Sequence, residues 1–201
     1  MNASLFTLTS KSFVFFIIIA LIITLLWLMG DSTLENLMYH RESIIEGQYW
    51  RFITAHLVHS NGWHLLLNLA SLLMIGWLFS QHLSIILWLF VFVCAALSIS
   101  AAYFWTAPQF EYYVGISAVL YAVIIVGALL EIKQQPLMAA VILLVVTGRV
   151  IWQQFSGSVD ALAELIDQRV AIESHLFGII SGYILGLSLL LRQRLWPQAI
   201  K

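Results

Sequence analysis

Six apolar runs fill most of this chain, and they restrict the folded chain to a lipid membrane. Hydrophobic residues make up 62% of the 201 residues and charged residues only 9%, against roughly 25% charged residues in a soluble domain. Because so few charges cannot cover a surface in water, the sequence predicts an all-α polytopic membrane protein. A single domain, residues 1–201, is expected to hold all the spans. The predicted spans are residues 12–29, 63–79, 83–105, 116–130, 136–153 and 175–191.

Charges beside the runs predict the direction in which the chain crosses the membrane. Basic residues concentrate on the cytoplasmic side, and those close to span ends count most. With the N-terminus in the cytoplasm, Lys11, Arg192 and Arg194 flank spans on that side, whereas nine of the ten acidic residues fall opposite. The sequence therefore predicts six spans with both termini cytoplasmic. No small-x-small cleavage pattern follows the first run, so we expect a retained helix rather than a signal peptide.

Three polar residues stand at helix starts that this orientation brings to one depth. Spans two, four and six run inwards, so His64, Ser117 and His175, at their upstream ends, share the outer leaflet. Span four, residues 116–130, is about 22 Å long, against a hydrocarbon core of about 30 Å. If Glu131 holds its lower end at the cytoplasmic interface, Ser117 lies below the outer surface. A water-filled cavity that opens outwards is then expected.

Small residues predict that spans four and six pack closely together. Small side chains at a spacing of four residues let two helix backbones approach each other. If these two faces meet, His175 comes within reach of Ser117. The stripe on span six is Gly178, Gly182 and Gly186, and span four offers Ala118, Ala122 and Gly127.

Ser117 and His175 are sufficient in principle for nucleophilic catalysis. A histidine can accept the hydroxyl proton and return it to a leaving amine. The start of span four also supplies free N–H groups and a partial positive charge, which suit a developing oxyanion. Glu173 and Ser174 precede His175 but face other sides of a helix, so no third member is assigned. Tyr121, one turn below Ser117, could pack against the imidazole.

Other polar residues of the apolar runs allow more than one interpretation. His64 and Asn68, one turn apart on one face, could donate hydrogen bonds to the oxygen of a tetrahedral intermediate, or could tie helices together. His56 and His59 together with His64 raise the question of a metal, but their spacing matches no familiar zinc pattern. No metal or other cofactor is therefore expected. Cys94, in the middle of a run, is expected to serve packing alone.

Several of these residues fall in motifs that resemble the rhomboid family of intramembrane serine proteases. The resemblance covers about residues 47–190, and the motifs follow one another in the order typical of that family. Together they are specific, although no single motif is. They are Tyr49-Trp-Arg-Phe-Ile-Thr-Ala-His56-Leu-Val-His59, His64-xxx-Asn68, Gly115-Ile-Ser117 with Tyr121-Ala, and His175-xx-Gly178-xxx-Gly182.

The resemblance implies a six-helix rhomboid-like bundle and a role for each motif. Ser117 would be the nucleophile and His175 its base. His64, Asn68 and the backbone N–H of Ser117 would form the oxyanion hole, and Tyr121 would stack on His175.

The remaining motif residues would support this arrangement. Gly115, Ala118 and Gly178 belong to the motifs around the site. Trp50, Arg51 and His59 would structure a first external loop that lies partly in the membrane plane. One residue departs from the family pattern, because Ala118 follows the nucleophile where the family usually has glycine. The extra methyl group puts the level of activity in question.

The leading hypothesis is a serine endopeptidase that cleaves membrane-anchored proteins near the outer face of a bacterial inner membrane. The compact chain is similar to the rhombosortase subgroup, which processes proteins with a C-terminal Gly-Gly tail, a hydrophobic helix and a basic end. Its partners would be a transmembrane or tail-anchored substrate and the lipid bilayer, with no nucleic acid; the sequence does not specify an oligomeric state. The alternatives are a catalytically inactive rhomboid-like binding or sorting protein, and a small transporter.

Overall fold

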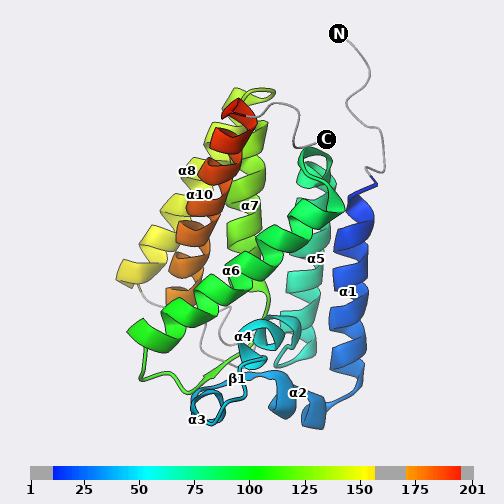
Figure 1. The fold of residues 1–201 in the computed structure, drawn as a ribbon, viewed down its shortest axis with the longest axis vertical. Coiled ribbons are helices and arrows are strands. Elements are labelled where there is room, and N and C mark those ends of the chain that lie inside the picture. Colours follow the sequence, from blue (N-terminus) through cyan, green and yellow to red (C-terminus); the bar gives the residue numbers. More distant parts are fainter. Residues whose placement is uncertain (1–10, 157–170, 196–201) are drawn as a thin grey trace.

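Each predicted apolar run forms a helix in the computed structural model, which describes residues 11–156 and 171–195 (Figure 1). The helix ends fall within a few residues of the predicted ones, because each run ends at a turn or at polar residues. Asn61 and Ser84 cap two of these helices by accepting the backbone N–H of His64 and Leu87. The six helices are α1 (Phe13–Leu28), α5 (Gly62–Phe79), α6 (Ile85–Thr106), α7 (Ser117–Glu131), α8 (Pro136–Ser156) and α10 (Ile172–Leu195).

The lengths of these helices make the chain a multi-pass membrane protein. Within the described residues, four helices are long and apolar enough to cross a bilayer, namely α6, α8, α10 and α5 with its extension η2 (Ser80–His82). A fifth candidate is the pair formed by α1 and α2 (Asp31–Leu37), which is bent by 118° at Gly30, where φ is +83°. Helix α7 has only 15 residues. It is therefore not among the candidate spans of the described residues, although the sequence predicts it as the fourth of six.

Helix α7 lies at the centre of the bundle, with α5 on one side, α8 and α10 on the other, and α6 crossing in front of them (Figure 1). Twelve of its 15 residues are buried, which is why it is apolar on every face. Helices α5, α7 and α10 begin at the same end of the bundle, the end that also carries α2 and α3 (Arg41–Ile45). The helix starts that the sequence placed at one depth therefore do lie together.

The closest packing in the bundle is between α7 and α10, where the glycines of α10 face small residues of α7. A Cβ atom at Gly182 would lie 2.7 Å from the carbonyl oxygen of Ala122, and one at Gly178 would lie 3.1 Å from the carbonyl carbon of Ala118. The predicted contact between these two helices is thus present. The predicted part for Gly127 was wrong, because this residue faces the ring of Phe79 in α5 instead.

Between α1 and α5 the chain folds into short elements that cover the end of the bundle. They include a two-residue strand β1 that pairs with β2, a feature that a purely α-helical prediction did not contain. The register places Tyr39 opposite Tyr113, so the first loop is joined to the segment that leads into α7. These elements are α2, β1 (Tyr39–His40), α3, α4 (Arg51–Thr54), η1 (Ala55–Leu57) and, before α7, β2 (Tyr112–Tyr113).

Arg51 holds this covering loop together from inside. Its side chain is only 5% exposed, and its guanidinium donates hydrogen bonds to the carbonyl oxygens of Glu35 and Met38 and to the side chain of Gln48, at 2.6–2.9 Å. Trp50 is about half exposed, and its ring N–H donates to the carbonyl of Asn36. A single buried arginine thus joins the C-terminal end of α2 to the segment that leads into α4.

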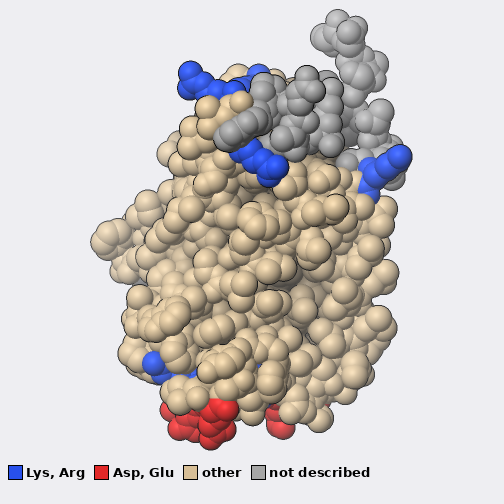
Figure 2. Space-filling view, in the orientation of Figure 1, with Lys and Arg blue, Asp and Glu red and all other residues tan. Residues whose placement is uncertain are grey.

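Charge is distributed unevenly along the long axis of the molecule. Figure 2 shows the acidic side chains gathered at the end that carries α2 and α3, and most of the visible Lys and Arg side chains at the opposite end. Glu131 is an exception among the acidic residues, because it ends α7 at the opposite end of the bundle, where its carboxylate lies buried beside the His82 ring. Some charges used to predict the orientation lie outside the described residues: Asp160, Glu164, Asp167, Arg169 and Lys201.

Candidate active site

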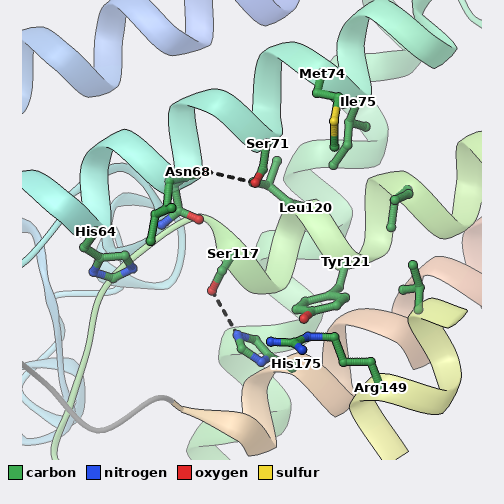
Figure 3. A pocket seen from close by; sticks show the side chains of 13 residues that line it. His64, Asn68, Ser71, Met74, Ile75, Ser117, Leu120, Tyr121, Arg149 and His175 are labelled. Carbon is green, nitrogen blue, oxygen red and sulfur yellow. Dashed lines mark hydrogen bonds between the residues drawn. The ribbon is translucent and has the colours of Figure 1, made fainter. Parts of the chain in front are cut away.

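The hydroxyl of Ser117 and the imidazole of His175 meet at the starts of two adjacent helices. Ser117 is the first residue of α7, and His175 lies in the first turn of α10. The distance from Ser117 Oγ to His175 Nε2 is 3.1 Å, although 58 residues separate the two along the chain. Figure 3 shows both side chains pointing toward one another. The pair therefore has the geometry of a hydrogen-bonded nucleophile and base.

This pair lies in the wall of a cavity of about 400 Å³ between α5, α7, α8 and α10. Ser117 is partly exposed, whereas His175 is 5% exposed. The cavity is apolar away from the pair, so it can take a hydrophobic segment while its polar groups act at one point. Its lining residues are His64, Leu67, Asn68, Ser71, Met74, Ile75, Ser117, Leu120, Tyr121, Ile124, Val146, Arg149 and His175.

Helix α5 places two hydrogen-bond donors beside Ser117. His64 and Asn68 are both buried, and Nδ2 of Asn68 has no hydrogen-bond partner among the described residues. The hydroxyl of Ser60 lies 3.0 Å from His64 Nδ1; when it donates there, the imidazole carries its proton on Nε2. The Nδ2 group of Asn68 is therefore a donor in the cavity wall that makes no hydrogen bond to another helix among the described residues.

Gly115 is the point around which these two donors converge. Its φ is +105°, and an added Cβ atom would lie 2.6 Å from His64 Nε2 and 3.7 Å from Asn68 Nδ2. Its N–H donates to the carbonyl of Ala55 at 3.0 Å. Only glycine gives both the backbone conformation and the space that the imidazole occupies.

A hydrogen-bonded group under the first loop holds the segment that carries Gly115. The hydroxyl of Tyr113 donates to the carbonyl of Gly115 at 2.8 Å and lies 3.3 Å from His56 Nδ1. On its other side, His56 Nε2 lies 2.9 Å from the hydroxyl of Ser100 and 3.2 Å from the carbonyl of Ala96, both in α6. Complete burial lowers the pKa of His56 to about 4 and raises the pKa of Tyr113, so both side chains are neutral.

Tyr121 packs against the imidazole of His175, with 4.6 Å between the ring centres and 48° between the ring planes. The two rings are tilted rather than parallel. Tyr121 lies one turn after Ser117 on α7, so one helix presents both the hydroxyl and the aromatic ring to the histidine. The contact restricts rotation of the imidazole about its side-chain bonds.

The histidines of the first loop do not form a ligand set. His59 is 3% exposed, has no hydrogen-bond partner on either ring nitrogen among the described residues, and packs edge-on against His64. Burial, followed by the neighbouring His64, lowers the pKa of His59 to about 3. His56 turns away toward α6 instead. In the part of the chain that the structure describes, no group of three or more His, Cys, Asp or Glu side chains could hold a metal ion.

A further residue at the site was missed by the sequence reasoning. Oε1 of Gln153, on α8, lies 3.3 Å from His175 Nδ1, on the side of the imidazole opposite Ser117. Arg149, one turn earlier on α8, also extends toward His175 (Figure 3). The available signal was the polar pair Gln153-Gln154 at the end of a largely apolar run, but a pair of adjacent glutamines does not say which of them points inwards.

Fold and site together define a class: a multi-pass helical membrane protein that brings a serine and a histidine into contact at two helix starts. A rhomboid domain matches residues 46–192, which is most of the chain. The chain therefore belongs to the rhomboid family, whose members are generally intramembrane serine proteases. A comparison with curated proteins found no match.

Proposed function

We propose that this chain is an active intramembrane serine endopeptidase in which Ser117 is the nucleophile and His175 the general base. The observation that carries the proposal is the 3.1 Å contact between Ser117 Oγ and His175 Nε2 in the wall of the cavity. Polar groups inside a membrane protein are costly to keep and usually serve function. Other polar pairs join helices of this bundle, such as Thr147 and Tyr183, but among the described residues only this pair places a base against a partly exposed hydroxyl in the cavity.

The reaction follows from the positions of the side chains. His175 Nε2 takes the proton of Ser117 as Oγ attacks the carbonyl carbon of the scissile bond. The developing oxyanion accepts hydrogen bonds from Asn68 Nδ2, His64 Nε2 and the N–H groups at the start of α7. His175 then gives the proton to the leaving amine. Water attacks the resulting ester in the same manner, and the carboxyl product leaves.

The proposal includes an orientation and a class of substrate. The basic end of the bundle faces the cytoplasm of a bacterium, in accordance with the preference of Lys and Arg for that side. The chain then crosses the inner membrane six times, with both termini inside and Ser117 toward the periplasm. The substrates are membrane-anchored proteins of the rhombosortase type, with a Gly-Gly sequence ahead of a hydrophobic helix and a basic end. Glycine lets a substrate helix unwind at the cavity.

Labelling by a serine-directed fluorophosphonate tests the catalytic pair. The purified protein in detergent should be labelled, and Ser117→Ala and His175→Ala should each abolish labelling. Ser71→Ala is the matched control, because Ser71 lines the same cavity but donates to the carbonyl of Leu67. Labelling that survives Ser117→Ala would refute the assignment of the nucleophile. A folded wild-type protein that neither reacts nor cleaves would instead support a binding or sorting protein.

Substrate class is tested separately with reporter proteins in liposomes. One reporter carries the Gly-Gly, hydrophobic and basic tail, a second has Val-Val in place of Gly-Gly, and a third lacks the basic end. The first should be cut near the Gly-Gly sequence, with the site located by mass spectrometry, and the others more slowly. Equal cleavage of all three reporters would reject the rhombosortase assignment but leave the protease assignment intact.

A further inference from the structure

Gln153 is placed to act on His175 from the side opposite Ser117. The two ring nitrogens of His175 have different partners: Nε2 meets Ser117 Oγ at 3.1 Å, and Nδ1 meets Oε1 of Gln153 at 3.3 Å. Gln153 is 1% exposed, on a helix that otherwise buries only Ala139 and Val150. A buried amide on a helix that buries so few residues is expected to have a partner, because burial of a polar group is costly without one.

The partner oxygen decides where the imidazole holds its proton. An amide oxygen can only accept hydrogen bonds, so Nδ1 beside it must carry a proton. In a neutral imidazole the other nitrogen, Nε2, then has a free lone pair. That lone pair faces the hydroxyl of Ser117, which is the arrangement needed to accept its proton. The opposite tautomer would present an N–H to Ser117 and could not act as a base.

We propose that Gln153 is a positioning residue that holds the His175 imidazole in the tautomer with its proton on Nδ1. The inference rests on the proposed function, since the tautomer matters only if His175 takes the proton of Ser117. It extends the Ser–His pair into a Ser117–His175–Gln153 series drawn from α7, α10 and α8. Each member in this series hydrogen-bonds to the next through a defined atom, which is how a neutral third residue orients a base.

The orientation of the amide makes this inference testable. Nε2 of Gln153 has no hydrogen-bond partner among the described residues. If the amide were turned round, its NH₂ group would donate to His175 Nδ1 and the imidazole would carry its proton on Nε2. Glutamate has only acceptor oxygens when ionised, so Gln153→Glu keeps the proposed contact and breaks the reversed one. Methionine has a similar length and keeps neither.

The neighbouring glutamine supplies a matched control. Nε2 of Gln154 donates to the carbonyl of Ile172 at 2.9 Å, so Gln154 also joins α8 to α10 but does not touch the histidine. If the only effect of Gln153 were to attach one helix to the other, Gln153→Met and Gln154→Met would weaken the protein alike. A positioning role predicts that Gln153→Met alone changes the chemistry.

The experiment measures the rate constant of fluorophosphonate labelling in detergent and the kcat and KM for a cleaved reporter. We expect Gln153→Met to lower the labelling rate and kcat by about 100-fold, with little change in KM. Gln153→Glu should restore most of the rate, and Gln154→Met should stay within about threefold of the wild type. Equal rates for Gln153→Met and the wild type would overturn the inference, as would a Gln153→Glu variant that folds but is no faster than Gln153→Met.

Nitrogen-15 NMR of the histidine side chains gives a readout that a purely structural role would not change. The His175 signal, identified by its loss in His175→Ala, should show the proton on Nδ1 in the wild type and a mixture of tautomers in Gln153→Met. This readout decides the matter even if Gln153→Glu does not fold. An unchanged tautomer in Gln153→Met would refute the inference. Labelling that survives Ser117→Ala would instead refute the proposed function, so the two failures are distinguishable.

Discussion

His56 should make the stability of this protein depend on pH. Its imidazole is 2% exposed and lies between α6 and the segment that carries Gly115. Burial lowers its pKa to about 4 in the folded protein, against about 6.5 in an unfolded chain. The unfolded state therefore binds a proton more readily than the folded state between these two values. The contribution of the neutral imidazole to stability is complete above about pH 6.5 and declines as the pH falls toward about 4.

The size of this effect follows from the two pKa values. A difference of one pKa unit corresponds to about 1.4 kcal/mol, so the full contribution is about 3 kcal/mol. Between about pH 7 and about pH 5 the loss is about 2 kcal/mol. His56→Gln removes this loss, because an amide does not titrate but still offers a donor and an acceptor. The variant starts less stable at neutral pH, since its shorter side chain cannot reach every partner of the imidazole.

Unfolding in mixed micelles, followed by tryptophan fluorescence, measures the prediction. The free energy of unfolding is determined at about pH 7 and about pH 5 for the wild type and His56→Gln. The other titrating groups are common to both proteins, so the difference between the two pH dependences isolates His56. His40→Gln controls for the loss of an imidazole at the same end of the bundle. If the wild type and His56→Gln lose the same free energy on acidification, the buried neutral state assigned to His56 is wrong.

Three further outcomes are expected from the packing and the donors at the site. Gly182→Ala should lower the free energy of unfolding by about 1–3 kcal/mol and slow labelling, since its methyl group would lie 2.7 Å from an α7 carbonyl oxygen. The control Gly148→Ala, where no atom lies within 4 Å of the new methyl group, should change neither the stability in thermal unfolding nor the rate of labelling. Asn68→Ala should lower kcat of reporter cleavage by about 100-fold without lowering the melting temperature, and an unchanged kcat would remove Asn68 from the oxyanion hole. Gly115→Ala should abolish reporter cleavage, because φ is +105° and the new Cβ would lie 2.6 Å from an imidazole nitrogen; a fully active variant would show that the loop can shift without consequence.

The helices could be predicted from the sequence because the signal for each of them is local. A run of apolar residues between polar segments is enough to place a helix in lipid, where no other open-ended backbone structure is satisfied. The short fourth helix and the shared depth of Ser117 and His175 followed from helix length and alternation of direction. These inferences needed no knowledge of which side chains touch.

The missed features all depend on contacts between distant segments. Arg51 was expected to structure the first loop, but no pattern in the sequence indicates that its guanidinium reaches the carbonyls of Glu35 and Met38. Glu131 was expected to hold the lower end of α7, but its contact with His82, in η2, could not be predicted. The contact of Gln153 with His175 could not be predicted for the same reason, since the two residues lie on different helices.

The distance between Ser117 and His175 is set by residues that take no part in the proposed chemistry. Ala118 follows Ser117 directly, and Gly178 lies one turn after His175, so the contact between Ala118 and Gly178 lies directly beside the Ser117–His175 pair. Because a Cβ atom at Gly178 would collide with the Ala118 carbonyl, any larger residue there would force the helices apart and lengthen the 3.1 Å contact. The methyl group of Ala118 is fully buried and therefore acts on the packing around this contact. The small residues on both helices thus allow the close approach on which the contact between the serine and the histidine depends.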